Sequence, residues 1–135
     1  MSIERILLTH AERIQYPAQL FGAYFPFHVE PRIYAMADYI AAEYEGGSWE
    51  MYRLSNGAFY MHPVAEEPYA VVCDNYYFGK LSPDAFGITA CLYAYSFLSF
   101  LDIEQLAEIG ATQYHLLREY ALEHLESAEI MAAAD

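Results

Sequence analysis

Residues 44–63 read YEGGSWEMYRLSNGAFYMHP, and this stretch decides how the chain folds. The turn 55–57 separates two runs, 49–54 and 58–62, that have the aromatic-rich composition of strands. An Asn-Gly pair is a strong signal for a type I′ hairpin turn, which needs positive φ at both central residues. The stretch therefore predicts an antiparallel ribbon whose register is set by this turn.

A helix is predicted immediately before the ribbon. Apolar residues recur at helical spacing over residues 31–44, and Pro31 suits the first helical position. Gly46 and Gly47 then stop the helix and free the backbone to enter the sheet.

Two further strands are predicted after the ribbon, over residues 69–73 and 76–80, with Asp74 and Asn75 forming the turn between them. Consecutive strands joined by short turns favour a single antiparallel meander of three or four strands.

The first 28 residues give weaker patterns. Residues 3–8 fit either a strand or the first turns of a helix. Pro17 interrupts a helical pattern over 11–22, which predicts two short helical pieces. Residues 24–27 are expected to form a loop that carries aromatic anchors.

A buried helix is predicted over residues 82–101. Ser82, Pro83 and Asp84 supply a cap, a first-position proline and an early carboxylate in the right order. The residues that follow are apolar on nearly every side, which is typical of a central helix. Gly87 within it allows close approach to the sheet.

A second long helix is predicted over residues 103–125, capped by Asp102 and weakened at Gly110. Ser127 is expected to cap a last short helix. The buried stripe of the long helix is predicted to contain Leu106, Ile109, Gln113, Leu117 and Tyr120.

The expected fold class is α+β. We predict one domain over residues 1–135, in which a three- or four-stranded antiparallel sheet packs against several helices and the C-terminal half is helical. No apolar run is long enough for a membrane span, and the start of the chain does not have the pattern of a signal peptide. A cytoplasmic protein, monomeric or weakly dimeric, is expected.

Charge is the strongest signal in the composition. Nineteen carboxylates face six Lys and Arg residues, which gives a net charge of −13. Such a surface repels nucleic-acid phosphates, so direct binding to nucleic acid is not expected. It favours protein partners with basic clefts, although acidity can also serve solubility alone.

The sequence shows no catalytic or metal-binding motif. Cys73 and Cys91 lie in apolar surroundings and are predicted to be reduced, buried thiols. No glycine-rich phosphate loop is present. We therefore expect no enzyme activity, no metal and no cofactor. The histidines, none of which has metal-ligand spacing, are His10, His28, His62, His115 and His124.

Residues 44–63 resemble the signature of the ArdB/KlcA antirestriction family, which has the approximate form YDGGxWxFYxLSNGGFYMAP. Residues 81–90 resemble the next block of that family, and residues 120–130 resemble its C-terminal block. The chain departs from the signature at Glu45, Met51 and Ala58. These changes preserve the strand pattern and the turn.

The resemblance implies a small α/β protein made by plasmids, phages or integrated elements. It also implies protection of incoming DNA from type I restriction enzymes, with no established catalytic residue, metal or cofactor. The signature residues are better explained as folding information than as contact sites. They are Gly46, Gly47, Trp49, Ser55, Asn56, Gly57, Phe59 and Tyr60.

Together, these observations predict an inhibitor that acts by binding rather than by catalysis. Its partner is expected to be a type I restriction complex or an associated DNA-processing factor. Two alternatives stay open: an interaction module for another host nuclease or plasmid-maintenance factor, and an enzyme acting through Cys73 or Cys91. The candidate acidic contact residues are Glu104, Glu108, Glu119 and Glu123 on the long helix, with Glu43, Glu45 and Glu50 beside the sheet.

Overall fold

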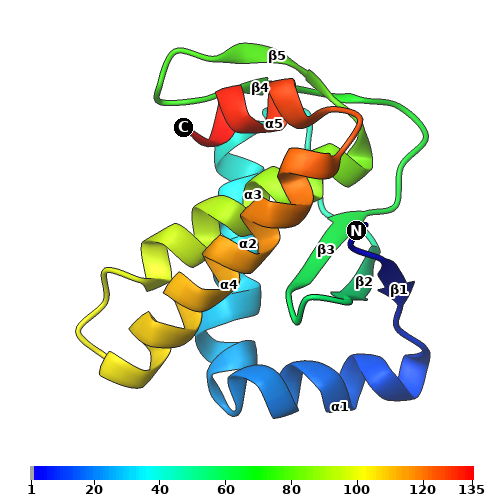
Figure 1. Ribbon diagram of the computed structural model, residues 1–135. Coiled ribbons are helices and arrows are strands. Elements are labelled where there is room, and N and C mark those ends of the chain that lie inside the picture. The colour runs from blue at the N-terminus through cyan, green and yellow to red at the C-terminus, as the bar shows by residue number, and fades with distance from the viewer. Residues whose placement is uncertain (1) are drawn as a thin grey trace.

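A computed structural model describes residues 2–135. The α+β class is confirmed, with two small antiparallel sheets lying at different sides of the helices (Figure 1). In chain order the elements are β1 (Arg5–Leu7), α1 (His10–Phe21), the π-helix η1 (Phe25–Val29), α2 (Glu30–Ile40), β2 (Trp49–Leu54), β3 (Phe59–Pro63), β4 (Tyr69–Val72), β5 (Phe78–Leu81), α3 (Pro83–Leu98), α4 (Glu104–Glu123) and α5 (Ser127–Ala134).

The predicted hairpin is present, but its turn is of a different type. β2 and β3 pair antiparallel, with Arg53 opposite Phe59. The Gly57 amide donates to the Leu54 carbonyl at 2.9 Å, and Gly57 has φ +96°. Asn56 does not have positive φ, so the type I′ prediction is wrong. Instead, a three-residue turn with one glycine in the left-handed region connects the two strands of the hairpin.

The three-stranded sheet has the order β1-β2-β3, so its third strand comes from the N-terminus. β4 and β5 pair only with each other, and the single meander predicted from the sequence is wrong. The reason lies at the outer edge of β3, which helices cover. The N-terminal residues, for which strand and helix were both open, form the strand β1 opposite Leu54 and Tyr52.

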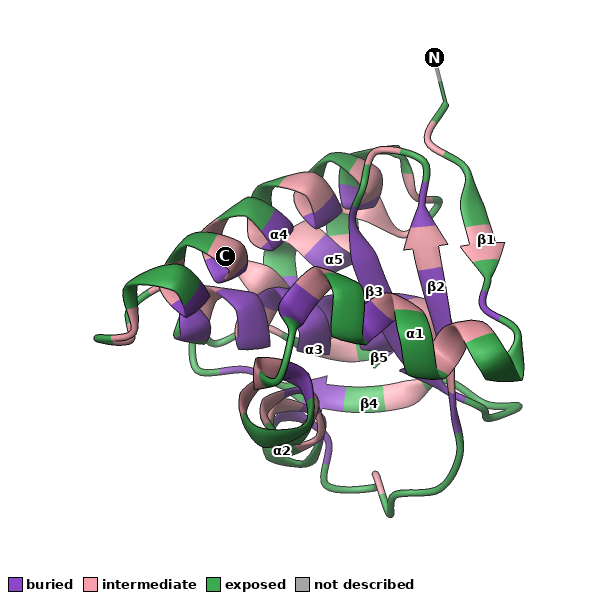
Figure 2. Ribbon diagram, turned by 90° about the horizontal axis from the view of Figure 1, so that it is seen from below, coloured by how far each residue is buried: buried purple, intermediate pink, exposed green. Residues whose placement is uncertain are grey.

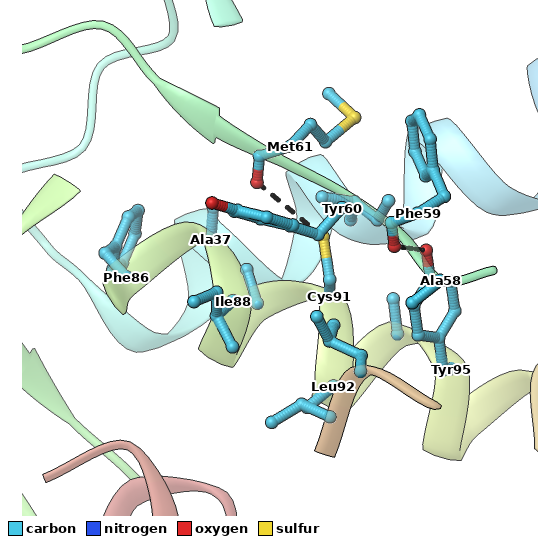
Figure 3. Packing of buried hydrophobic residues seen from close by; sticks show 14 of the residues in the cluster. Ala37, Ala58, Phe59, Tyr60, Met61, Phe86, Ile88, Cys91, Leu92 and Tyr95 are labelled. Atoms are coloured by element: carbon cyan, nitrogen blue, oxygen red, sulfur yellow. Dashed lines mark hydrogen bonds between the residues drawn. The ribbon is translucent and has the colours of Figure 1, made fainter. Parts of the chain in front are cut away.

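Side chains from α3 and α4 cover that outer edge of β3. Tyr95 Oη donates to the Phe59 carbonyl at 2.6 Å, and Cys91 Sγ lies 3.7 Å from the Met61 carbonyl (Figure 3). Gln113 on α4 accepts from the Phe59 amide at 2.8 Å through Oε1 and donates to the Gly57 carbonyl at 3.2 Å through Nε2. The edge groups are therefore satisfied by side chains, and no further strand pairs there.

α3 is the buried centre of the molecule, as predicted (Figures 1 and 2). Ser82 caps it by accepting from the Ala85 amide at 3.1 Å. A side chain at Gly87 would collide with the backbone of His62, so this glycine allows α3 to touch β3 directly.

α4 packs along α3. Its buried residues include Leu106, Gln113 and Leu117, as predicted, but Gly110 and Ala121 are buried where Ile109 and Tyr120 were expected. A Cβ at Gly110 would lie 2.9 Å from the Leu98 Cβ, so this residue is a close helix contact rather than a weak point. The residue at the cap position is Ile103, and the predicted Asp102 cap is wrong.

The N-terminal helices differ from the prediction in two places. Residues 10–21 form one continuous helix with Pro17 buried inside it, stabilised at its start by a capping box between Thr9 and Glu12. The predicted loop at 24–27 is mostly helical, since η1 begins at Phe25, although Phe25 does anchor the core by packing against Phe21 and Phe59.

α2 ends at Ile40, four residues before the predicted end, because Ala41 takes an extended conformation. Gly46 and Gly47 have φ of +86° and +104°, so they supply the turn into the sheet as predicted. Tyr44 lies between them and the helix, and its hydroxyl accepts from Trp49 Nε1 at 2.9 Å.

Among residues 2–135, no helix has the length and apolar character needed to cross a lipid bilayer.

Candidate functional site

The four glutamates predicted on the long helix all lie on exposed positions of α4. Their spacing on a helix of 3.6 residues per turn places them on one side. Glu104 and Glu108 lie near the start of α4, and Glu119 and Glu123 lie near its end, so they form two separate pairs. Glu123 also makes a hydrogen bond within the protein, since its Oε1 accepts from the Ile3 amide at 3.0 Å.

The other three predicted glutamates do not join this face. Glu43 and Glu45 are exposed in the segment between α2 and β2, and Glu43 Oε1 accepts from the Ala70 amide of β4 at 3.4 Å. Glu50 is half-buried on β2 and points into a polar cluster, where its Oε1 accepts from Tyr52 Oη at 3.4 Å and lies 4.0 Å from His62 Nε2.

That polar cluster is centred on Asp84, at the start of α3. Asp84 Oδ1 accepts from Tyr60 Oη at 2.6 Å and from Arg5 Nη1 at 2.8 Å, while Oδ2 accepts from His124 Nε2 at 2.7 Å. His62 Nε2 lies 3.8 Å from Oδ1. We call this group the Asp84 cluster; its members are Arg5, Glu50, Tyr52, Tyr60, His62, Asp84 and His124.

The hydrogen bonds fix how both histidines are oriented. His62 Nδ1 faces the Pro63 carbonyl at 2.8 Å and must donate to it, and His62 Nε2 lies 3.2 Å from Tyr52 Oη. His124 Nδ1 accepts from the Glu126 amide at 2.9 Å, which leaves its Nε2–H to donate to Asp84.

These contacts keep Asp84 ionised. Burial acts to raise the pKa of Asp84, but hydrogen bonds from His124 and Tyr60, together with the charge of Arg5, outweigh burial and hold that pKa below its ordinary value. Burial and the adjacent carboxylate raise the pKa of Tyr60 far above its ordinary value. The Asp84 carboxylate is therefore held as an anion among donors from Arg5, Tyr60 and His124.

The geometry indicates a structural role for the Asp84 cluster. Its groups come from β1, β2, β3, the start of α3 and the residue after α4, so it ties elements distant in the sequence. In the part of the chain that the structure describes, every buried side-chain nitrogen and oxygen has a hydrogen-bond partner. Asp84 accepts three hydrogen bonds from its own chain, so it is not poised as a general base.

The two thiols do not form a reactive centre. Cys73 and Cys91 are free and buried, as predicted. Burial raises the pKa of Cys91 to about 12 and also raises the pKa of Cys73. Because the thiolate is the nucleophile, neither residue is activated. Across residues 2–135, no group of three or more His, Cys, Asp or Glu side chains has a geometry that would hold a metal ion.

The Asp84 cluster was only partly predictable from the amino-acid sequence. The hairpin register places Tyr52 opposite Tyr60 and Glu50 opposite His62, so these four side chains share one face of the sheet. Asp84 was interpreted only as an early helical carboxylate. Its bonds to Arg5, 79 residues away, and to His124, 40 residues away, leave no local signal in the sequence.

Comparisons with known proteins extend over nearly the whole chain. A family model described as antirestriction protein matches residues 42–135. An antirestriction protein KlcA of Escherichia coli is 34% identical over 138 residues, which is 96% of this chain and 92% of the relative. The protein YfjX of Escherichia coli strain K12 is 38% identical over 111 residues, which is 79% of this chain and 70% of that relative.

A solved structure has the same fold. It aligns with a TM-score of 0.91 and 31% identity, and it covers 100% of this chain and 96% of that chain. It is described as one of the KlcA and ArdB proteins, which show a novel fold and antirestriction activity against type I DNA restriction systems in vivo but not in vitro. The resemblance carried by residues 44–63 is thereby confirmed, and this chain belongs to the antirestriction protein family.

Proposed function

We propose that this protein protects incoming DNA from type I restriction enzymes by binding a protein partner, without catalysis, inside the cell. The observation that carries the proposal is its membership of the antirestriction family, with a fold that matches KlcA and ArdB over the full chain. The absence of an activated nucleophile at Cys73 or Cys91 supports binding over chemistry.

The activity reported for KlcA and ArdB in vivo but not in vitro bears on the partner. A protein that bound the purified restriction enzyme directly would be expected to inhibit it in vitro as well. We therefore favour an associated DNA-processing factor of the host over the restriction complex itself.

The acidic face of α4 is the proposed contact surface. Exposed carboxylates at Glu104, Glu108 and Glu119 attract a basic partner at long range, and the net charge of −13 adds to that attraction. Glu43 and Glu45 provide weaker candidates on another part of the surface. Glu50 is better explained by its contacts within the Asp84 cluster.

The test is the plating efficiency of unmodified phage on a host that carries a type I restriction system, with and without the protein. We expect wild-type protein to raise plating markedly on this host and to have no effect on an otherwise identical host without restriction. Equal plating with and without the protein on the restricting host would refute the proposal.

Charge reversal tests the surface. The triple variant Glu104→Lys, Glu108→Lys and Glu119→Lys should lose protection while its circular dichroism stays unchanged. Glu123 is left intact because it binds the Ile3 amide. The matched control reverses Asp38, Glu66 and Glu67, which are exposed on other segments and are not candidate contact residues. Full protection by the α4 variant would remove this face from the mechanism.

One alternative partner, another host nuclease, can be distinguished by experiment. A module directed at another host nuclease would protect DNA in cells that lack type I enzymes but contain that nuclease. The same plating assay on such hosts separates the two functions.

A further inference from the structure

The small sheet of β4 and β5 has an open edge along β5. The Cys73 amide donates to the Tyr77 carbonyl at 2.8 Å, so these two residues form a hydrogen-bonded pair at the end of the ladder. Hydrogen-bonded and non-hydrogen-bonded pairs alternate along antiparallel strands, and the register then makes Phe78 and Lys80 members of non-hydrogen-bonded pairs. The backbone amides and carbonyls of Phe78 and Lys80 therefore point away from β4, toward the free side of β5.

The two edges of this sheet differ in how they are covered. On β4 the outward amide of Ala70 donates to Glu43 Oε1 at 3.4 Å. On β5, within residues 2–135, no protein group accepts from the outward amides of Phe78 and Lys80. β5 also lies at the outside of the molecule, beyond β4 (Figure 1). An unpaired edge of this kind is a template on which another strand can pair.

The outer face of the β4–β5 hairpin is apolar as well as exposed. Val72 and Phe78 lie directly opposite each other in the register, and they are 71% and 78% exposed. Tyr76, in the turn between the strands, is 93% exposed. Single exposed apolar residues are common on protein surfaces, but several gathered beside an open strand edge indicate an interaction site.

The hairpin is held in place by the rest of the protein. The Tyr69 ring stacks on the Phe86 ring of α3, with centroids 4.4 Å apart. In the turn, Asn75 Nδ2 donates to the Ala132 carbonyl of α5 at 2.9 Å, and Asn75 Oδ1 accepts from the Tyr77 amide at 3.0 Å. Because these contacts fix β5 in advance, a strand that pairs with it loses little free energy in ordering the hairpin.

The charge of the hairpin distinguishes between occupants. Residues 68–82 contain one acidic residue, Asp74, and one basic residue, Lys80, so this segment is neutral within a chain of net charge −13. A basic partner strand would find no row of carboxylates here. A second copy of the hairpin would meet no excess of like charge at the contact itself.

The β5 edge is complementary to itself in one register. When the Gly79 residues of two copies lie opposite each other in antiparallel strands, the outward backbone groups of Phe78 meet those of Lys80 in the second copy. Phe78 and Lys80 share the outer face, so each ammonium lies beside a phenylalanine ring of the other copy, which is a favourable cation–π contact. Lysine on an edge strand often prevents pairing, but in this register no lysine faces another.

We propose that two copies of the chain associate through β5, antiparallel about a two-fold axis at Gly79, so that their hairpins form one four-stranded sheet. The contact involves a strand of four residues, so the dimer is weak. Since each copy carries a net charge of −13, salt screens their repulsion and strengthens the dimer. The inference goes beyond the proposed function, because the pairing does not use the acidic face of α4.

Sedimentation equilibrium of the wild-type protein over a range of concentrations tests the dimer. We expect a monomer–dimer equilibrium with a dissociation constant on the order of 0.1 mM. The dissociation constant should fall as the salt concentration rises from about 0.05 M to about 0.5 M. A monomeric mass at every concentration up to about 1 mM, at both salt concentrations, would overturn the inference.

Two proline variants form a matched pair for the edge. Phe78→Pro removes an outward amide of β5, and Val72→Pro removes the outward amide of its cross-strand neighbour on β4. Neither amide belongs to the β4–β5 ladder, so each variant keeps the hydrogen bonds of its hairpin. We expect Phe78→Pro to raise the dissociation constant about tenfold or more and Val72→Pro to match wild type. Equal effects of the two variants would overturn the inference; circular dichroism and the urea midpoint establish that each is folded.

A charge exchange tests the register without changing the backbone. Phe78→Lys places a lysine opposite Lys80 of the second copy, so it should raise the dissociation constant about tenfold at about 0.15 M salt. Adding Lys80→Glu to this variant puts opposite charges across the contact, and we expect it to restore the dissociation constant to within about threefold of wild type. Absence of this rescue would overturn the pairing about Gly79.

Phage plating separates this inference from the proposed function. A wild-type protein that is monomeric, and whose protection is lost with Phe78→Pro but kept with Val72→Pro, would assign the β5 edge to a different protein and overturn the inference. The sedimentation result does not depend on protection, so failure of wild type to protect would refute the proposed function alone.

Discussion

Gly87 on α3 lies directly against the backbone of His62 on β3, with no room for a methyl group between them. The nearest atoms to a Cβ at this position are the Cβ and Cα of His62 and the carbonyl oxygen of Met61. Two of these belong to the backbone, so the helix and strand would have to move apart. The packing of the whole central helix on the sheet depends on this contact.

We therefore expect Gly87→Ala to destabilise the protein by about 3 kcal/mol or more, measured by urea unfolding. Gly110→Ala is a milder substitution for comparison. The atoms nearest to a Cβ at Gly110 would lie 2.9–3.1 Å from it, and the closest is a side-chain atom of Leu98. Its loss should be smaller. Equal stabilities for wild type and Gly87→Ala would contradict the packing described here.

Gln113 provides a second test, at the outer edge of β3. Gln113→Leu leaves the Phe59 amide and the Gly57 carbonyl without their side-chain partner, so the free energy of unfolding should fall by about 2–4 kcal/mol. Gln105→Leu is the control on the same helix, since Gln105 is exposed, and it should change stability by less than about 0.5 kcal/mol. Similar effects of the two substitutions would show that the edge bonds contribute little.

The Asp84 cluster predicts a pH dependence. Because the pKa of Asp84 is lower in the folded protein than in the unfolded chain, its ionised form stabilises the fold above about pH 4, and this contribution disappears as the pH falls through the folded pKa. Asp84→Asn should cost about 2 kcal/mol or more at pH 7 and progressively less below pH 4.

Urea unfolding of wild type and Asp84→Asn between pH 3 and pH 7 measures this difference. Asp38→Asn, an exposed substitution on α2, serves as the control and should follow wild type throughout. A difference between wild type and Asp84→Asn that grows toward acid would have the wrong sign and would contradict the assignment of Asp84 as the ionised partner.

Thiol reactivity tests whether the cysteines take part in function. At pH 8 the native protein should react slowly with a thiol-specific disulfide reagent, with Cys91 slower than Cys73, and both should react at once in urea. The double variant Cys73→Ser, Cys91→Ser should still protect phage DNA. Loss of protection by a correctly folded double variant would instead support an enzymatic mechanism that uses one of the cysteines.

The sequence-based predictions were accurate where a structure depends on neighbouring residues, and they failed where it depends on residues far apart in the sequence. The β2–β3 hairpin, the cap at Ser82 and the buried character of α3 depend on neighbouring residues, and all three were predictable. The pairing of β1 with β2 was not, because it joins residues about 50 positions apart and has no turn to mark it. The two-sheet division depends on Gln113, Tyr95 and Cys91 reaching the edge of β3 from other elements.

The exposed residues also differ in how far the sequence predicts them. The spacing of the four glutamates on α4 was readable from the helical period, and their exposure agrees with it. The exposure of Phe97 and Phe100 was not predictable, because both rings belong to an apolar run that suggests complete burial. α3 ends at Leu98, so Phe100 lies beyond the buried helix, and the Arg32 guanidinium packs over the Phe97 ring.

The ties between the N-terminal segment and the rest of the chain have a consequence for biosynthesis. Ile3 binds Glu123, 120 residues later, and Arg5 binds Asp84, 79 residues later. During synthesis this segment must therefore wait until Asp84 and Glu123 have emerged before it reaches its native partners. We expect nascent chains to keep this segment accessible to proteases until Glu123 has left the ribosome, and the segment to dock only after that point.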